Sequence, residues 1–142
     1  MALPHPAETQ CLAMRARKLA RRVNAIYDAA LAPHGMTIGQ FGLLGRLRRS
    51  RARRVMDLAD DMMADASTLS RLLKPLIAEG LVVSETDPYD ARARALRLTN
   101  KGAARVRAAL AGWETADRQV SARLGEDRAE LHRAIDSALP RL

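Results

Sequence analysis

Five side chains in one short segment carry groups that suit contact with nucleic acid. They are three hydroxyls and two cations: Ser67, Thr68, Ser70, Arg71 and Lys74. A helix that enters the major groove needs small, hydrogen-bonding or cationic side chains on its first two turns, because those turns approach base edges and phosphates. The leucines between and after these residues recur at helical spacing and are expected to face the core. An ordinary surface helix with polar residues is the alternative interpretation.

A second group of cations lies in "DPYDARARALRLT", residues 87–99, which begins as a turn and ends as a strand. Arg92 and Arg94 are expected at or just past the tip of a hairpin, where they could enter the minor groove of a duplex. Narrow A·T-rich segments of that groove concentrate negative potential and attract arginine. Asp90 stands two residues before Arg92 and is expected to orient its guanidinium. Solvated turn charges would give the same pattern.

A third basic segment is "RLRRSRARR", residues 46–54, which holds six arginines. It precedes the segment with the hydroxyls, so we expect it to contact phosphates rather than form a merely solvated face. Each phosphate neutralised adds roughly 0.9 to the salt dependence of DNA binding.

Other chemistry finds little support among the remaining residues. The single cysteine, Cys11, excludes an intramolecular disulfide framework, and three scattered histidines lack metal-ligand spacing. The sequence also shows no spacing typical of an active site, whether paired carboxylates, a Ser/His/Asp set or a glycine-rich phosphate loop. The acids in "DLADD", residues 57–61, are interpreted as solvating and capping groups. We therefore expect no enzymatic activity, metal or cofactor.

Composition favours a polyanionic partner. The 142 residues include 24 Lys and Arg against 16 Asp and Glu, for a formal charge of +8. Nucleic acid is the first candidate and an anionic membrane the second. An aromatic content of 3% counts against modules that stack single-stranded bases, which favours duplex. The sequence shows neither a membrane-spanning apolar run nor a signal peptide, so a cytoplasmic protein is expected.

The periodicity predicts mainly helices. Apolar residues at helical spacing predict a long helix over 8–32, a second over 38–49 and a third over 55–62. Asp65 is expected to cap a fourth helix that ends near Gly80, whose backbone suits a left-handed stop. Two short helices joined so tightly are typical of a helix-turn-helix.

A hairpin and two further helices complete the predicted order. "LVVSE" and "ALRL", residues 81–85 and 95–98, are expected to form the two strands, joined through a turn that starts at Asp87. Thr99 is expected to cap a long helix that Gly125 interrupts, and one more helix follows. A hairpin directly after a helix-turn-helix is a wing.

These segments together resemble the MarR (multiple antibiotic resistance regulator) family of winged-helix transcription regulators. The resemblance runs through "IYDAALAPHGMTIGQFGLL", "LADDMMADASTLSRLLKPLIAEGLV" and "DPYDARARALRLTNKG". It implies a mainly α homodimer with a small β-hairpin. Residues 8–35 and 99–142 would form a helical dimerisation lobe, and residues 36–98 a winged helix-turn-helix lobe that binds DNA. A two-fold dimer would suit a pseudo-palindromic operator.

The resemblance also implies roles for single residues. Ser67, Thr68 and Arg71 would contact the major groove. Arg92 would contact the minor groove with Asp90 as its partner. The family often has a basic residue before this arginine, where the present chain has Ala91, and Arg94 could compensate. Which arginine enters the groove stays open.

Regulators of this family typically respond to small phenolic or aromatic acids, or to oxidants through a cysteine near the start of the first helix. The chain is therefore expected to be a repressor that a small aromatic ligand releases from DNA. The residues expected to converge on an effector pocket are Met14, Arg15, His34, Met36, Phe41 and Trp113. A thiol switch at Cys11 is an alternative, although the tyrosines that partner the sensing cysteine in the family are not reproduced. A non-specific architectural DNA-binding protein is a further alternative.

Overall fold

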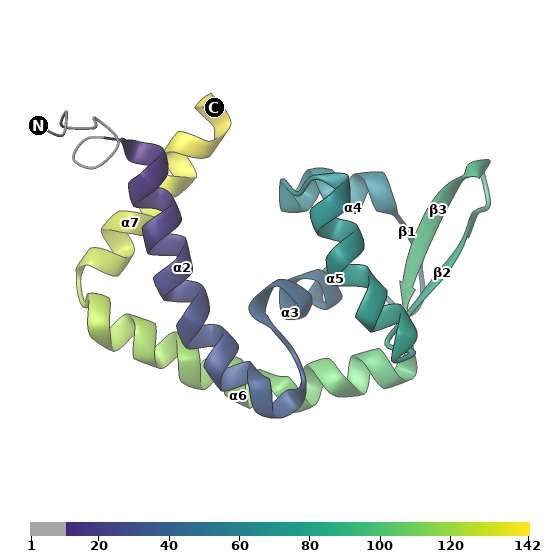
Figure 1. Cartoon of the computed structure of the whole chain (residues 1–142), viewed down its shortest axis with the longest axis horizontal. Coiled ribbons are helices and arrows are strands. Elements are labelled where there is room, and N and C mark those ends of the chain that lie inside the picture. The colour runs from purple at the N-terminus through teal and green to yellow at the C-terminus, as the bar shows by residue number, and fades with distance from the viewer. Residues whose placement is uncertain (1–10) are drawn as a thin grey trace, which may run out of the picture.

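The computed structural model describes residues 11–142, which are mainly helical with a small antiparallel sheet at one end of the molecule (Figure 1). In chain order the elements are α2 (Leu12–Leu31), the 3-10 turn η1 (Ala32–His34), α3 (Ile38–Gly45), β1 (Arg53–Arg54), α4 (Val55–Met62), α5 (Ala66–Ala78), β2 (Val82–Asp87), β3 (Asp90–Leu98), α6 (Asn100–Leu124), α7 (Asp127–Ala138) and the 3-10 turn η2 (Leu139–Arg141). The mainly α architecture with a helix-turn-helix and a wing confirms the expected fold class.

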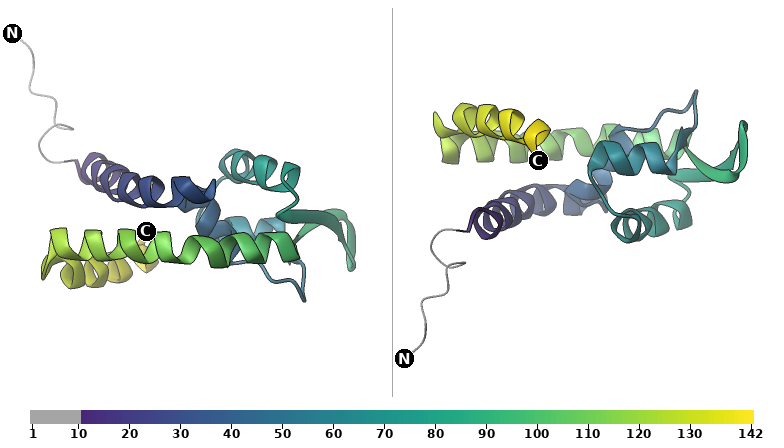
Figure 2. Two further views of the ribbon diagram at one scale, coloured as in Figure 1. Left: turned by 90° about the horizontal axis from the view of Figure 1, so that it is seen from below. Right: turned by 90° about the horizontal axis from the view of Figure 1, so that it is seen from above.

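The elements divide into two regions that α6 connects. In Figure 1, α6 runs along the bottom of the molecule from the sheet to α2 and α7, and α3, α4 and α5 lie above its first half. The C-terminal half of α2 crosses the middle of α6, where Tyr27 contacts Trp113 (Figure 1, Figure 2). The wing therefore projects from one end of the molecule, and the long helices extend from the other.

Side-chain caps fix where the helices begin. The Thr37 hydroxyl accepts a hydrogen bond from the Gln40 backbone N–H while the Gln40 side chain accepts one from Thr37, a reciprocal capping box at α3. Asp65 caps α5 by accepting from the Thr68 N–H, and Thr99 caps α6 by accepting from the Gly102 N–H. The two caps predicted from the sequence, at Asp65 and Thr99, are confirmed.

The helix-turn-helix follows its predicted bounds closely. Helix α4 has the predicted range, and α5 continues through Pro75, which lies inside the helix. Gly80 follows the end of α5 with φ of 74°, in the left-handed region that side chains with a Cβ rarely adopt. The predicted stop is confirmed.

The second predicted helix is shorter than expected. Helix α3 ends at Gly45 rather than near residue 49. The reason is tertiary, because the carbonyl of Arg48 accepts a hydrogen bond from the Leu98 N–H at 3.0 Å. The backbone after α3 thus approaches the sheet and cannot continue as a helix.

The sheet has a strand that the sequence analysis missed. Its order is β1-β3-β2, with Arg53 opposite Leu96 and Val82 opposite Leu98. Strand β1 is only two residues long and lies within the basic segment, where alternation gives no signal. The predicted strands are also too short, since β2 and β3 extend almost to the turn at residues 88–89.

One core holds the helix-turn-helix, the sheet and the start of α6 together. Its largest fully buried side chains are nine leucines and a valine: Leu31, Leu43, Leu44, Leu47, Leu58, Leu69, Leu76, Leu81, Leu96 and Val82. They come from α2, α3, α4, α5, β2, β3 and the segments between them, and they form one apolar cluster. Burial of this surface fixes the position of α5 against the wing.

Candidate nucleic-acid interface

The first two turns of α5 present a polar, exposed surface. Ser67, Ser70, Arg71 and Lys74 are exposed and Thr68 is half-buried, whereas the leucines at 69, 73 and 76 are buried beneath them. The leucine pattern predicted from the sequence therefore places the hydroxyls and cations on the solvent side of the helix. Their contacts with DNA remain a prediction.

Asp65 organises the start of this surface. Its Oδ1 accepts hydrogen bonds from the Thr68 N–H at 2.7 Å and from the Ser67 hydroxyl at 2.9 Å. The backbone hydrogen bond from Thr68, together with those from the two hydroxyls, lowers the pKa of Asp65. Arg71 in turn donates to the Thr68 hydroxyl at 3.4 Å. The cap thus orders the side chains that would meet base edges.

Both wing arginines lie in β3, past the tip that Pro88 and Tyr89 form, as the sequence analysis expected. The register pairs Thr86 with Arg94 and then Asp87 with Asp90, so the β3 residues 91–93 form a bulge. Arg92 lies in this bulge and is exposed.

Arg94 and Asp90 both make contacts within the wing. The Arg94 guanidinium folds onto β2 and donates to the Ser84 hydroxyl at 2.9 and 3.1 Å and to the Ser84 carbonyl at 3.2 Å. The Asp90 carboxylate accepts from the backbone N–H of Arg92 at 3.0 Å, not from its guanidinium. The expected Asp90 pairing is therefore wrong in its geometry: the carboxylate supports the bulge, and the Arg92 side chain extends into solvent.

Asp87 holds the wing in place, a role that the sequence analysis missed. Its side chain is only 6% exposed, and its carboxylate accepts from Arg54 Nε at 2.7 Å and from the N–H groups of Tyr89 at 2.8 Å and Asp90 at 3.1 Å. The hydrogen bond from Arg54 holds the pKa of Asp87 below its usual range. Because Arg54 is the residue before α4, this contact ties the hairpin turn to the first helix of the helix-turn-helix. The sequence showed Asp87 only as the start of a turn.

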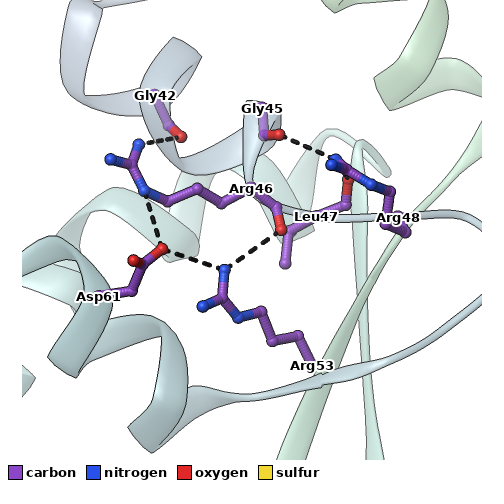
Figure 3. A network of polar contacts seen from close by, with 7 residues as sticks. All are labelled: Gly42, Gly45, Arg46, Leu47, Arg48, Arg53 and Asp61. Carbon is purple, nitrogen blue, oxygen red and sulfur yellow. Dashed lines mark hydrogen bonds and ion pairs between the residues drawn. The ribbon is translucent and has the colours of Figure 1, made fainter.

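The basic segment 46–54 makes many contacts within the protein. Arg46 Nε and Arg53 both contact the Asp61 carboxylate, at 3.1 and 3.2 Å, and Arg48 donates to the Gly45 carbonyl at 3.1 Å (Figure 3). Asp61 is one of the acids interpreted as solvating or capping groups, so that interpretation is wrong for this residue. It neutralises part of the segment instead.

The remaining arginines of this segment are divided between contact and exposure. Arg49 donates to the Asn100 side chain at 2.9 Å, and Arg54 is held by Asp87. Within residues 11–142, Arg51 makes no hydrogen bond or ion pair, and it is exposed. The expectation that all six arginines are available to bind phosphates is therefore too broad, because most of them make hydrogen bonds or ion pairs that stabilise the fold.

Comparison with known proteins agrees with this geometry. A family model described as MarR family matches residues 34–93. The M. tuberculosis transcriptional regulator MosR, solved in complex with DNA, is 30% identical over 91% of this chain and 98% of that chain, with a TM-score of 0.71. The chain belongs to the MarR family. This membership makes it a DNA-binding transcriptional regulator and not an enzyme.

Two more distant structures share the fold of this MarR-family chain. A mutant of E. coli MarR complexed with operator DNA is 22% identical, with a TM-score of 0.83 over 97% of this chain and 100% of that chain. The PcaV regulator of Streptomyces coelicolor, in complex with its natural ligand, is 20% identical, with a TM-score of 0.79 over 99% and 98%. No curated protein sequence matches the chain.

The residues expected to line an effector pocket separate into two places in this MarR-family protein. Phe41 stacks on Trp113 with ring centroids 6.3 Å apart, Met36 is buried, and His34 lies close to Gly112. Met14 and Arg15 lie near the start of α2, about 20 Å along the helix from Tyr27, which contacts Trp113. The subunit does not bring all six of these residues together. Only the C-terminal half of α2 crosses α6, and Met14 and Arg15 lie near the other end of α2.

Cys11 lies at the N-cap of α2 and is half-buried. Tyr27 is more than four turns further along the helix, and its hydroxyl donates to Asp117 at 2.7 Å. This places it out of reach as a partner for the thiol.

The contact between Tyr27 and Asp117 belongs to a polar network that the sequence analysis missed. Arg128 donates to both Asp117 carboxylate oxygens, at 2.9 and 3.1 Å, and to the Ser121 hydroxyl. Burial raises the pKa of Tyr27 to about 12, with the hydrogen bond to Asp117 adding to the shift, and the Tyr27 hydroxyl in turn lowers the pKa of Asp117. One signal pointed to it, since Asp117 interrupts the apolar stripe of its helix. The network joins α2, α6 and α7.

Two kinds of site are not found in the described part of the chain. Between residues 11 and 142, no group of three or more His, Cys, Asp or Glu side chains could hold a metal ion. Over the same residues, no helix has the length and apolar character needed to cross a membrane.

Proposed function

We propose that this regulator is a homodimeric, sequence-specific repressor that places α5 in successive major grooves and its wing in the adjacent minor groove. In each subunit, Ser67, Thr68, Ser70, Arg71 and Lys74 would contact the major groove. Arg92 would reach the minor groove. The observation that supports this assignment best is the exposed polar surface of α5 held beside a wing that the buried Asp87 fixes.

Arg92 is the better candidate of the two wing arginines for entry into the groove. It extends from the bulge without a side-chain partner among residues 11–142, whereas three hydrogen bonds to Ser84 hold Arg94 against β2. Moving Arg94 into the groove would first break those bonds. We therefore assign Arg94 and Asp90 to shaping the wing and Arg92 to the contact with DNA.

The helices outside the winged lobe support a dimer. Several large apolar side chains on α2, α6 and the C-terminal segment are exposed in the single subunit: Leu12, Met14, Leu110, Ile135, Leu139 and Leu142. Exposed apolar side chains gathered on the terminal helices indicate an interface. We propose that residues 8–35 and 99–142 form the dimerisation lobe and that residues 36–98 form the DNA-binding lobe. A two-fold dimer requires a pseudo-palindromic operator with half-sites one helical turn apart.

A small aromatic acid is the proposed effector. The structure of PcaV was solved with its natural ligand, which shows that a protein of this fold can bind one. In the present chain Phe41, Trp113 and Tyr27 form an aromatic cluster between α2, α3 and α6, with His34 at its edge. Ligand binding there would alter the spacing of the two α5 helices and release the operator. Met14 and Arg15 could join this site only from the partner subunit.

The central test is a gel-shift titration with promoter DNA from the protein's own neighbourhood and with a scrambled duplex of equal length. Sequence-specific binding is expected at physiological salt. Replacing Arg71 with Ala should weaken binding to the operator about 5- to 150-fold, the range for one good base contact. Arg133→Ala, which removes the same charge from the exposed face of α7, is the control. Equal affinity for both duplexes would instead identify a non-specific architectural protein.

The effector is tested by a thermal-shift screen against aromatic acids, with and without operator. A compound that stabilises the free protein and releases DNA would identify the effector class. The same assay with peroxide, on the natural chain and on Cys11→Ser, tests the thiol alternative. A peroxide response that disappears in the variant would replace the ligand-sensing proposal.

A further inference from the structure

The first turns of α6 hold the C-terminal end of α5, where the two helices meet (Figure 1). The last residue there is Glu79, the C-cap of α5: its carbonyl accepts from Lys101 Nζ at 2.8 Å, and its carboxylate contacts Arg105 Nη2 at 3.2 Å. The Thr99 hydroxyl donates to the carbonyl of the next residue, Gly80, at 2.7 Å. Cations suit this position because the last carbonyls of a helix lack partners within it and form the negative end of its dipole. The end of α5 is therefore tied to α6.

Arg105 also contacts the turn between α2 and α3. Its Nη1 donates to the carbonyl of His34, the last residue of η1, at 3.4 Å. The same nitrogen lies beside Gly35, where an added Cβ would be 3.3 Å from it. A guanidinium presents its donors at fixed angles in one plane, so one side chain can hold acceptors on two segments at once. Arg105 thus bridges η1 and the end of α5.

The turn η1 in its own right lies against the aromatic cluster. Gly112, the residue before Trp113, is in close contact with α2 and η1. A Cβ added at this glycine would lie 2.6 Å from the Ala30 carbonyl oxygen and 3.3 Å from His34 Cδ2. Close packing of this kind leaves little free space, so a displacement within the cluster moves the backbone of η1 with it.

We infer that Arg105 is a positioning residue that couples the aromatic cluster to α5 through His34 and Glu79. Its contact distances of 3.2 and 3.4 Å are at the long end for hydrogen bonds, so a small displacement of η1 is enough to make or break the bridge. Because α5 is one continuous helix of 13 residues, displacement of its C-terminal end changes the angle at which its first turns meet the major groove. This inference rests on the proposed function and adds the route by which an effector at the cluster acts on DNA binding.

Reciprocal coupling allows a test that needs no identified effector. If the cluster influences the affinity of α5 for DNA, then DNA binding must influence the cluster by the same coupling free energy. Trp113 is the single tryptophan of the chain and belongs to the cluster, so its fluorescence reports on the cluster directly. Titration of the natural chain with operator duplex should change Trp113 emission in step with the anisotropy of a labelled duplex.

Three variants separate the bridge from the other contacts at the end of α5. Arg105→Ala removes the bridge, and Glu79→Ala removes one end of it while keeping the carbonyl that Lys101 binds. Both variants should still bind the operator but lose most of the change in Trp113 emission. Lys101→Ala is the matched control, because it removes a cation from the same end of α5 without a contact to η1, and it should keep the emission change. Melting curves check folding, and if Arg105→Ala does not fold, Glu79→Ala provides the test.

Several results would overturn the inference. A full emission change in Arg105→Ala would do so, as would operator binding by the natural chain without any change in emission. An equal loss in Lys101→Ala would also overturn it, because general loosening of α5 would then explain the result.

The proposed function fails separately from this coupling. If the natural chain does not distinguish operator from scrambled duplex, the proposed function is wrong whatever the emission shows. If specific binding occurs and Arg71→Ala weakens it while the emission results differ from those expected, only the coupling inference is wrong.

Discussion

Removal of a single hydroxyl tests the network that joins α2, α6 and α7. In Tyr27→Phe the ring keeps its packing against Trp113, while the hydrogen bond to Asp117 at 2.7 Å is removed. Asp117 keeps both of its hydrogen bonds from Arg128, so the carboxylate does not become an unpaired charge. The substitution therefore measures one hydrogen bond.

The expected size of the effect follows from the type of hydrogen bond and from the exposure of the network. A hydrogen bond to a charged group contributes about 1.5 to 3 kcal/mol. Burial is the largest cause of the rise in the pKa of Tyr27 to about 12, and it disfavours the phenolate rather than measuring this bond. Arg128 and Asp117 are 29% and 23% exposed, so solvent weakens the interaction. We expect Tyr27→Phe to lower the free energy of unfolding by about 1 to 2 kcal/mol at neutral pH.

The sign of the pH dependence follows from the two shifts. Since the pKa of Tyr27 is raised, its contribution is complete below pH 10 and is lost as the pH rises towards 12. Since the pKa of Asp117 is lowered, its contribution is present above the ordinary aspartate range and is lost as the pH falls through the lowered value. The difference between Tyr27→Phe and the natural chain should therefore be constant near neutral pH and shrink in strong acid.

Urea denaturation at one fixed protein concentration measures the effect, because a dimer's stability depends on concentration. Tyr89→Phe is the matched control, since the Tyr89 side chain is 92% exposed at the tip of the wing. If Tyr27→Phe costs no more than this control, the network does not stabilise the fold and the reasoning is refuted.

Three further substitutions test the wing and its junction with α6. Asp87→Asn removes the charged partner of Arg54 and should weaken operator binding and speed amide exchange in the turn; normal exchange rates would contradict a role in holding the wing. Gly102→Ala would place a Cβ 2.1 Å from the Leu81 carbonyl oxygen, so we expect a loss of about 1 to 3 kcal/mol in a thermal melt, and an unchanged melt would show that the helix can shift. Thr99→Ala removes the cap of α6 and should cost about 1 kcal/mol, whereas Thr99→Ser should recover most of it.

Local rules accounted for most of the elements. The caps at Asp65 and Thr99, the range of α4 and the left-handed stop at Gly80 depend on residues within one or two turns of each other. Such short-range interactions leave a pattern in the sequence, so they could be predicted from it. The order of helices and hairpin then led to the family.

Interactions between distant segments could not be predicted in the same way. The end of α3 at Gly45 depends on a hydrogen bond from Leu98, 50 residues after Arg48, and strand β1 exists only because β3 lies beside it. Asp90 was paired with the wrong group of Arg92, because sequence spacing gives proximity but not the direction of a side chain in a bulged strand.

The sequence by itself determined the mainly helical fold, the polar surface of α5 and the basic character of the wing, since each is a matter of local periodicity or charge. Only the tertiary structure decided that Asp87 anchors the wing, that Asp61 neutralises Arg46 and Arg53, and that Arg94 folds onto Ser84. The physical reason is that an arginine in a sequence has a charge but no partner. Folding decides which carboxylate it meets and which donors it has left for DNA.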